Sequence, residues 1–393
     1  MDTRLFKNLK RENKMKKICF ITTVPTTLQA FVLGTAKYIH ENTDWDITFI
    51  CDCDEEFEKS LPDYIHYISV PMKRGVSVAG IKAMLQMKKI FQKEKFDLIQ
   101  YSTPNASLYA SIAGKLAKVP VRLYCQWGMV FVGFQGIKRW IFKQEEKFVC
   151  KLSTWIEPDS KSNLEFAHSE GLYPENKGSV IWNGSASGVS LEKFDISKKQ
   201  EYRQKIRSEY SIPDDAFFYG FVGRITRDKG INELLQAYKS IMNENSYLLM
   251  VGNEELDENM NMELFNWSKN NSQVIYTGAT NVVEQFLSAM DVYILPSYRE
   301  GFGSGVIEAE AMGVPVIVSN IPGPTDAMIK DETGLIVQKA DVDSLKSAMS
   351  EIRNNENMRE CMAEKAYIFA RDNFEQKKLY SYILDDRKKL LGE

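Results

Sequence analysis

Short hydrophobic runs rich in β-branched and aromatic residues alternate with longer stretches of helical periodicity along the chain. The runs of the first half are KKICFIT, DITFICD, YIHYISV, DLIQYST, VRLYCQ, TWIEPD and GSVIWN. The helical stretches between them lie near residues 28–41, 77–95, 105–118 and 136–152. Strands that alternate with helices in this way predict a parallel sheet of the α/β class.

The same alternation starts again after residue 184. Its strand candidates are FFYGFVG, YLLMVGN, VIYTG, DVYILPS, VPVIVSN and GLIV. The helical candidates lie near residues 230–243, 258–269, 281–289 and 304–312. The turn-forming stretch from Asn183 to Gly188 separates the two series, and Asn183 is interpreted as structural.

The length of 393 residues exceeds what one hydrophobic core usually organises. We therefore predict two Rossmann-like α/β domains that face a cleft. The first covers residues 15–183 and binds the acceptor, and the second covers 184–372 and binds the donor. Residues 373–393 form a C-terminal helix that could cross back onto the first domain.

The segment from Asp291 to Asn320 reads as strand, glycine loop and helix in that order. Ligands of doubly wound sheets bind beyond the carboxyl ends of the strands, so this loop is a candidate site. Glycine lets the backbone approach a ligand closely. The free amides around Gly303, Ser304 and Gly305 would suit a phosphate at the start of the helix.

Glu300 precedes this helix and Glu308 lies about one turn inside it. Carboxylates accept hydrogen bonds from hydroxyl groups, which sugars supply in number. Spacing alone leaves a second interpretation open, in which Glu300 is a solvated loop residue and Glu308 a surface anion near a positive helix end.

The pattern P-S-x-x-E-G-F-x-x-x-x-x-E-A-x-A-x-G-x-P-V-I, with seven residues between Glu300 and Glu308, resembles the E-x7-E signature of the family 4 retaining glycosyltransferases of the GT-B fold. The resemblance implies that Glu300 binds the donor sugar and Glu308 the ribose. It also implies that the backbone from Phe302 through Gly303 to Ser304 binds the phosphates.

A second segment, Gly220-FVGRITRDKG-230, resembles the V-G-R-x-x-x-x-K-G loop of that family. The resemblance implies that Arg224 and Lys229 neutralise the donor diphosphate, and that the backbone of Gly278 contacts the base. Without it, an arginine and a lysine after a strand would be interpreted as surface charges. Fixed cations suit this reaction, since the leaving diphosphate gains charge.

The first half departs from the family pattern at two places. Thr26 and Thr27 stand in the loop where many members have a glycine pair, and their hydroxyls could bind phosphate or acceptor or cap the next helix. Trp127 stands immediately before Gly128, at the position where the family commonly has a histidine. Gln126 and Trp127 would shape the sugar pocket or belong to the core. The family's mechanism, in which the donor phosphate accepts the proton of the acceptor hydroxyl, does not need this histidine.

The resemblance implies a retaining transferase that moves a hexose or N-acetylhexosamine from a UDP donor to a glycan or a polyprenyl-diphosphate-linked acceptor, in bacterial capsule, exopolysaccharide or lipid-linked oligosaccharide synthesis. The alternatives are a GT-B epimerase or phosphorylase and a non-catalytic nucleotide-sugar-binding subunit. We expect neither metal nor cofactor, because cationic side chains can do that work, and no nucleic-acid partner.

Charge divides unevenly, with basic residues in excess up to residue 183 and acidic residues in excess after it. The segment 129–151 mixes aromatic with basic residues, and indicates either a packing helix or contact with an anionic membrane surface. No run of apolar residues is long enough to span a bilayer. The six cysteines show no disulfide or metal spacing, so we expect a cytoplasmic protein, peripheral at most on the membrane. Residues 1–14 read as a polar extension.

Overall fold

The computed structural model describes residues 15–72 and 78–393, so the extension expected at residues 1–14 lies outside the described residues, as does the first residue of the helix expected at 77–95. Clustering of the described contacts divides the chain into two units. Unit 1 comprises residues up to Cys125, Lys147–Ile156 and Ile383–Glu393. Unit 2 comprises Gln126–Glu146 and Glu157–Tyr382. The boundary expected at residue 183 stays a prediction.

The first sheet has the strand order β3-β2-β1-β4-β5-β6. Its strands are β1 (Lys17–Ile21), β2 (Asp46–Cys51), β3 (Ile65–Ser69), β4 (Leu98–Tyr101), β5 (Val121–Gln126) and β6 (Trp155–Pro158). The helices between them are α1 (Pro25–Phe31), α2 (Leu33–Asn42), α3 (Glu55–Ser60), α4 (Val78–Glu94), α5 (Pro104–Ala117) and α6 (Gly136–Leu152). The pairings of β1 with β2 and with β4 are parallel, as the alternating pattern predicts.

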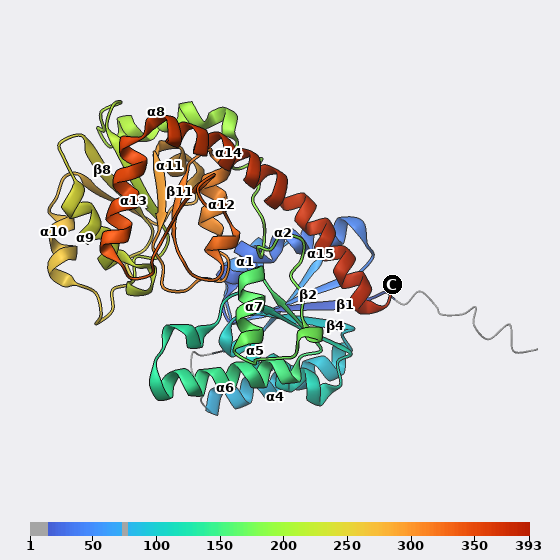
Figure 1. Ribbon diagram of the computed structural model, residues 1–393. Helices are drawn as coiled ribbons and strands as arrows, with labels where there is room; N and C mark the ends of the chain where they lie inside the picture. The colour runs from blue at the N-terminus through green and yellow to red at the C-terminus, as the bar shows by residue number, and fades with distance from the viewer. Residues whose placement is uncertain (1–14, 73–77) are drawn as a thin grey trace, which may run out of the picture. The chain divides into compact units, whose positions relative to one another are not determined.

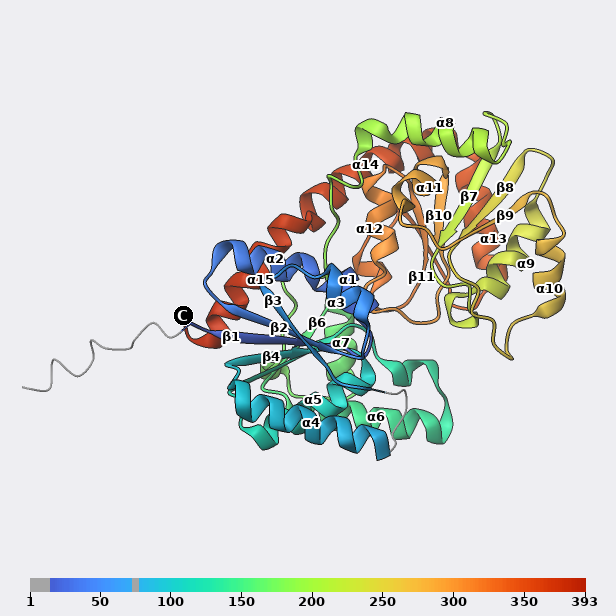
Figure 2. The same ribbon diagram turned by 180° about the vertical axis from the view of Figure 1, so that it is seen from behind.

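The second sheet has the order β12-β11-β10-β7-β8-β9. Its strands are β7 (Phe217–Val222), β8 (Ser246–Val251), β9 (Val274–Gly278), β10 (Val292–Leu295), β11 (Val316–Ser319) and β12 (Gly334–Val337). The helices are α8 (Lys199–Glu209), α9 (Ile231–Ile241), α10 (Met262–Lys269), α11 (Val283–Ala289), α12 (Ser304–Ala311), α13 (Val342–Asn354) and α14 (Glu356–Phe374). Figures 1 and 2 show helices on both faces of this sheet. The fold is therefore α/β with two parallel doubly wound sheets, as predicted.

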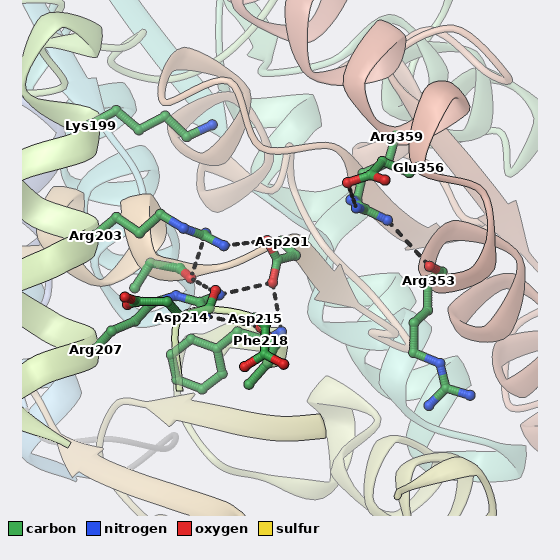
Figure 3. A network of polar contacts seen from close by, with 12 residues as sticks. Lys199, Arg203, Arg207, Asp214, Asp215, Phe218, Asp291, Arg353, Glu356 and Arg359 are labelled. Carbon is green, nitrogen blue, oxygen red and sulfur yellow. Dashed lines mark hydrogen bonds and ion pairs between the residues drawn. The ribbon is translucent and has the colours of Figure 1, made fainter. Parts of the chain in front are cut away.

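The amino end of β10 is held by a partly buried charge cluster, which Figure 3 shows. The Asp291 carboxylate accepts hydrogen bonds from Arg203 (2.7 Å), Arg207 (3.0 Å) and the backbone amide of Phe218 (2.7 Å). The Arg207 side chain is 2% exposed and that of Asp291 is 15% exposed, so water reaches this pair mainly from the aspartate side. The cluster ties α8 to β7 and β10, whose opposite ends carry the site.

One expected strand is wrong. The run GSVIWN, residues 178–183, forms no strand in the structure. Trp182 adopts a φ of +50°, which is incompatible with an extended strand, and its ring stacks on Tyr382 at 5.5 Å and lies 6.5 Å from that of Phe374. The aromatic side chain that suggested a strand thus packs against the C-terminal helices.

The C-terminal segment is helical, as expected, and continues after α14 as α15 (Gln376–Leu391). Its last part, from Ile383, clusters with unit 1 rather than with unit 2. Arg387, which is 1% exposed, donates from Nε to the side-chain oxygen of Gln100 in β4 over 3.1 Å. The end of the chain is therefore part of the core of unit 1.

Candidate functional site

Two loops of unit 2 follow neighbouring strands at the carboxyl edge of its sheet. One runs from β10 to α12 and contains Glu300, and the other runs from β7 to α9 and contains Lys229. They touch at Gly230, where φ is +74° and any side chain would collide with the carbonyl oxygen of Pro296. Only glycine permits this approach, so the two loops form one surface.

The two loops pair residue by residue. Lys229 contacts the Glu300 carboxylate at 2.5 Å, and Ser297 donates to the same oxygen over 2.7 Å. One residue back in each loop, Arg299 donates to Asp228 over 2.9 Å. A hydrogen bond from Arg227 to the Tyr298 hydroxyl completes the set. The loops that the sequence indicated separately thus meet, and the Lys229–Glu300 pair is at their centre.

The pair is well shielded, since the Lys229 and Glu300 side chains are 18% and 12% exposed. Charges in such a place interact more strongly than in bulk water. A ligand that separates them must offer a negative group to the lysine and hydrogen-bond donors to the glutamate. A sugar attached to a diphosphate carries both kinds of group.

Glu308 lies in the second turn of α12, where the sequence placed it. Burial raises the pKa of its carboxyl to about 7, Glu284 raises it further, and the positive charge of Lys193 lowers it. Lys193 lies 3.8 Å from the Glu284 carboxylate. The Glu308 carboxyl therefore binds a proton at a higher pH than an exposed glutamate does.

The start of α12 lies where the sequence predicted a phosphate-binding loop, and that role stays a prediction. Gly303 adopts a left-handed conformation with φ of +89° at the cap position, and Ser304 begins the helix. The Phe302 side chain is 2% exposed and packs on Phe374 at 5.3 Å, so only its backbone can contact a ligand. Gly305 lies against the Tyr293 hydroxyl, which leaves no room for a side chain.

Two further residues predicted to bind the donor, Arg224 and Gly278, have no contact with the Lys229–Glu300 pair among the interactions described for them. Arg224 pairs with Glu255 at 2.9 Å, and both side chains are about half exposed. Gly278 is exposed at the end of β9, with φ of +72° and open space around its Cα. The structure therefore joins Lys229 to Glu300 but leaves Arg224 in a separate surface ion pair.

The expected acceptor residues fall in different environments. Thr26 and Thr27 lie in the first turn of α1 in unit 1, and the cap position of that helix is Val24. Gln126 is fully buried, where it donates to Glu146 over 2.5 Å and accepts from Tyr173 over 3.2 Å. Its amide is thus engaged at both ends. This engagement favours a core role for the amide group itself.

Trp127 lies beside the Glu300 loop. A side chain placed on Gly301 would come within 2.9 Å of the Trp127 carbonyl carbon and 2.6 Å of the Asp159 carboxylate. The Trp127 backbone is therefore in the same neighbourhood as Glu300, although the two are far apart in sequence.

The sequence did not reveal that a polar segment after β6 forms hydrogen bonds with the loop that carries Glu300. Ser160 donates to the Gly301 carbonyl over 3.2 Å, and the Asn163 side-chain amide donates to it as well. Ser160 also caps α7 (Lys161–Ser169) by accepting from the amide of Asn163. The polar run after the strand TWIEP was the available signal, but a capping serine alone does not indicate contact with a distant loop.

Among residues 15–72 and 78–393, no three or more His, Cys, Asp or Glu side chains gather closely enough to hold a metal ion. The metal-free chemistry expected from the sequence stays a prediction. The Asp52 and Asp54 pair, for example, is engaged locally, because the two side chains accept from the backbone amides of Cys53 and Phe57.

Comparison with family models matches both halves of the chain. Residues 202–369 match the model described as glycosyl transferases group 1, and residues 17–157 match the one described as glycosyl transferase 4-like. The first range begins within α8 and ends within α14, so it contains all of β7 to β12. The second range contains β1 to β5 and all of β6 except its last residue.

The chain is similar to curated proteins over most of its length. It is 30% identical over 351 residues to the capsular polysaccharide biosynthesis glycosyltransferase CapM of Staphylococcus aureus, covering 88% of this chain and 90% of that protein. It is 28% identical over 329 residues to the UDP-Gal:alpha-D-GlcNAc-diphosphoundecaprenol alpha-1,3-galactosyltransferase of Escherichia coli, covering 80% and 81%. Among solved structures, Anabaena HepE in complex with UDP has the same fold, with a TM-score of 0.76 at 16% identity over 95% of this chain and 100% of that chain.

Proposed function

Because the chain belongs to the group 1 glycosyl transferases, we propose that it transfers a hexose or N-acetylhexosamine from a UDP donor held by the loops of Glu300 and Lys229. The observation that carries this proposal is the shielded Lys229–Glu300 pair between loops of neighbouring strands. A UDP donor is supported by the name of the Escherichia coli relative, which specifies UDP-Gal.

The proposed reaction retains the configuration of the sugar. The bond from the anomeric carbon to the diphosphate oxygen breaks, and the acceptor hydroxyl oxygen forms its new bond on the same face. The hydroxyl proton passes to the departing phosphate oxygen. Lys229 stabilises the negative charge that gathers on the diphosphate, since a preorganised cation in a shielded site needs little rearrangement.

Each donor residue has a place in this proposal. Glu300 exchanges its lysine partner for sugar hydroxyls when the donor binds, and Glu308 binds the ribose. The backbone amides of Gly303 and Ser304 bind the phosphates, and Gly278 contacts the base. Arg224 leaves its exposed partner and joins the diphosphate. No metal or other cofactor takes part, because these cations supply the positive charge.

The proposed acceptor is a glycan or a sugar on polyprenyl diphosphate, in bacterial surface polysaccharide synthesis. Support comes from the names of the relatives, one a capsule enzyme and one specific for a diphosphoundecaprenol-linked sugar. We assign Thr26 and Thr27 to the acceptor diphosphate. Trp127, beside Gly301, forms a wall of the sugar pocket, with Gln126 holding its strand in place.

We also propose that α6 rests on an anionic membrane surface. Four apolar side chains of this helix are strongly exposed, at 78% for Ile137, 63% for Trp140, 50% for Ile141 and 45% for Phe148. Basic residues, Lys138 and Lys147 among them, lie on the same helix, which Figure 1 labels. Apolar and basic side chains together favour the interface of an anionic bilayer.

None of the helices within the described part of the chain combines the length and hydropathy needed to cross a bilayer.

Flotation with vesicles of phosphatidylcholine and phosphatidylglycerol tests the membrane proposal. We expect retention at low salt, and a loss of most of it in K138E/K147E, because charge attraction weakens with each basic residue removed. The matched control is K339E/K346E, which makes the same charge change at two exposed sites of unit 2. Equal retention of all three proteins, or none of the wild type, would contradict the membrane proposal.

The transferase proposal is tested by UDP release from UDP-glucose, UDP-galactose, UDP-N-acetylglucosamine and UDP-N-acetylgalactosamine, with and without polyprenyl-diphosphate-linked sugar. We expect release from one donor, increased by the acceptor. Binding of the donors with no turnover, even with acceptor lipid, would instead indicate a non-catalytic nucleotide-sugar-binding subunit.

A further inference from the structure

Asp159 is a buried carboxyl group that no step of the proposed reaction uses. It follows β6 directly and precedes the capping residue of α7. The residue is 7% exposed, and its Oδ1 atom is buried without a hydrogen-bond partner. A buried carboxylate without a cation is costly, so such a group needs either a partner or a proton.

The Asp159 side chain packs directly against the loop that carries Glu300. Its second oxygen would lie 2.6 Å from a Cβ placed on Gly301, which shows that the loop backbone approaches this carboxyl closely. The next residues, Ser160 and Asn163, hold the Gly301 carbonyl. The backbone of Asp159 is fixed as well, because its carbonyl accepts from Ser185 over 2.7 Å. One rigid segment therefore supports the residue next to Glu300.

The neighbouring charged groups with the largest effect on the Asp159 carboxyl are acidic. Burial raises the pKa of Asp159 to about 8, its own backbone amide lowers it, and Glu300, Asp326 and Glu157 raise it further. Asp326 is held in the 3-10 turn Pro324–Asp326, where it accepts from Ser162. Lys229, the cation of the loop pair, is engaged with Glu300.

We propose that Asp159 is a positioning residue: its buried carboxyl group packs against the Gly301 backbone and so fixes Glu300 in the donor-sugar pocket. This inference rests on the proposed donor role of Glu300. In the protonated form Asp159 is neutral, and the loop can pack on it. Loss of the proton places a second anion beside Glu300 in a shielded site, which repels the glutamate and moves its loop.

The proton on Asp159 makes the use of the donor depend on pH. If only the protonated form supports the loop, kcat/KM for the donor falls about tenfold between pH 7 and pH 9, as expected for one group that titrates near pH 8. D159N replaces the carboxyl with a neutral amide of the same shape, and removes this titration.

The experiment is the ratio of kcat/KM in D159N to that in wild type across this pH range, with the UDP-sugar that gives the fastest UDP release. We expect the ratio to rise about tenfold from pH 7 to pH 9. E165Q, an exposed carboxyl-to-amide change on α7, is the matched control and should keep a constant ratio to wild type. A constant D159N ratio would overturn the proposal.

Two readouts need no turnover and so separate this inference from the proposed function. The melting temperature of D159N minus that of wild type should increase from pH 5 to pH 8. The reason is that the folded wild type holds a proton that the unfolded chain releases. In wild type labelled with carbon-13 at the aspartate carboxyl groups, one group should titrate near pH 8. If neither effect is seen, Asp159 is ionised and the proposal fails; if both appear without turnover, only the proposed function fails.

Discussion

Single residues of the site have their roles through their neighbours. Lys229 and Glu300 alone would be an ordinary lysine and glutamate, but the structure pairs them at 2.5 Å between two loops. The sequence singled out both residues because each follows a strand and belongs to a recognisable motif. Their pairing is a new finding, whereas their roles in donor binding stay predictions.

Gly301 offers a residue-scale prediction. A methyl group there would press on the Asp159 carboxyl group and the Trp127 backbone, so G301A must move the loop. A displacement of this kind near reacting groups costs on the order of 100-fold in kcat/KM. We expect this loss in the UDP-release assay, while circular dichroism shows a folded protein. Wild-type activity in G301A would mean that the loop position does not control the chemistry.

The environment of Asp159 could not be predicted from the sequence. An aspartate before a capping serine reads as a solvated turn residue, and its burial depends on a loop more than a hundred positions away in the chain. The same holds for Gln126, whose partners Glu146 and Tyr173 lie in other elements. Long-range packing, rather than local pattern, decides both.

At the scale of elements, hydrophobic periodicity predicted most strands and helices, and failed where tertiary contacts dominate. The strand, loop and helix around Glu300 were predicted correctly, because the hydrophobic run, the glycines and the helix start all agree. The run containing Trp182 was predicted wrongly, because its aromatic ring packs on α14 and α15 instead of within a sheet.

Helix α12 carries a second acidic residue whose effect should be on stability. Glu310 is fully buried, and burial raises its pKa well above the ordinary 4.5. A folded-state pKa above that of the unfolded chain means that folding binds a proton, so stability is lost as pH rises from about 4.5 towards the folded pKa.

E310Q should remove this loss. We expect its free energy of unfolding to exceed that of wild type by an amount that grows with pH, by up to about 1.4 kcal/mol per pH unit in the window above 4.5. Urea unfolding at pH 5 and pH 8 measures the difference. E364Q, at an exposed site of α14, is the control and should show no such growth. A pH-independent difference for E310Q would contradict the burial argument.

At the scale of the whole molecule, two α/β units each have their own sheet and core. The family expected from the sequence is confirmed by models that match both halves of the chain. The return of the chain end to unit 1 through Arg387 was expected only as a possibility, since the charged C-terminal segment has no motif that names its partner.

Arg387 should stabilise unit 1 selectively. R387A removes a buried guanidinium and its hydrogen bond to Gln100, which should cost about 1–3 kcal/mol. Hydrogen exchange should therefore speed up in β4 and not in β10. K389A, an exposed lysine in the same helix, is the control. Equal acceleration in both sheets would show that α15 does not act on unit 1 alone.

We propose that Lys229 and Glu300 form one donor site with divided roles, phosphate for the lysine and sugar for the glutamate. The most direct test of this proposal measures UDP affinity by calorimetry and sugar turnover together in wild type, K229A and E300Q. K229A should weaken UDP binding about 10- to 100-fold, as expected for the loss of a charge-assisted hydrogen bond. E300Q should reduce turnover by on the order of 100-fold while UDP affinity stays close to that of wild type. Full turnover in E300Q, or unchanged UDP affinity in K229A, would contradict the claim.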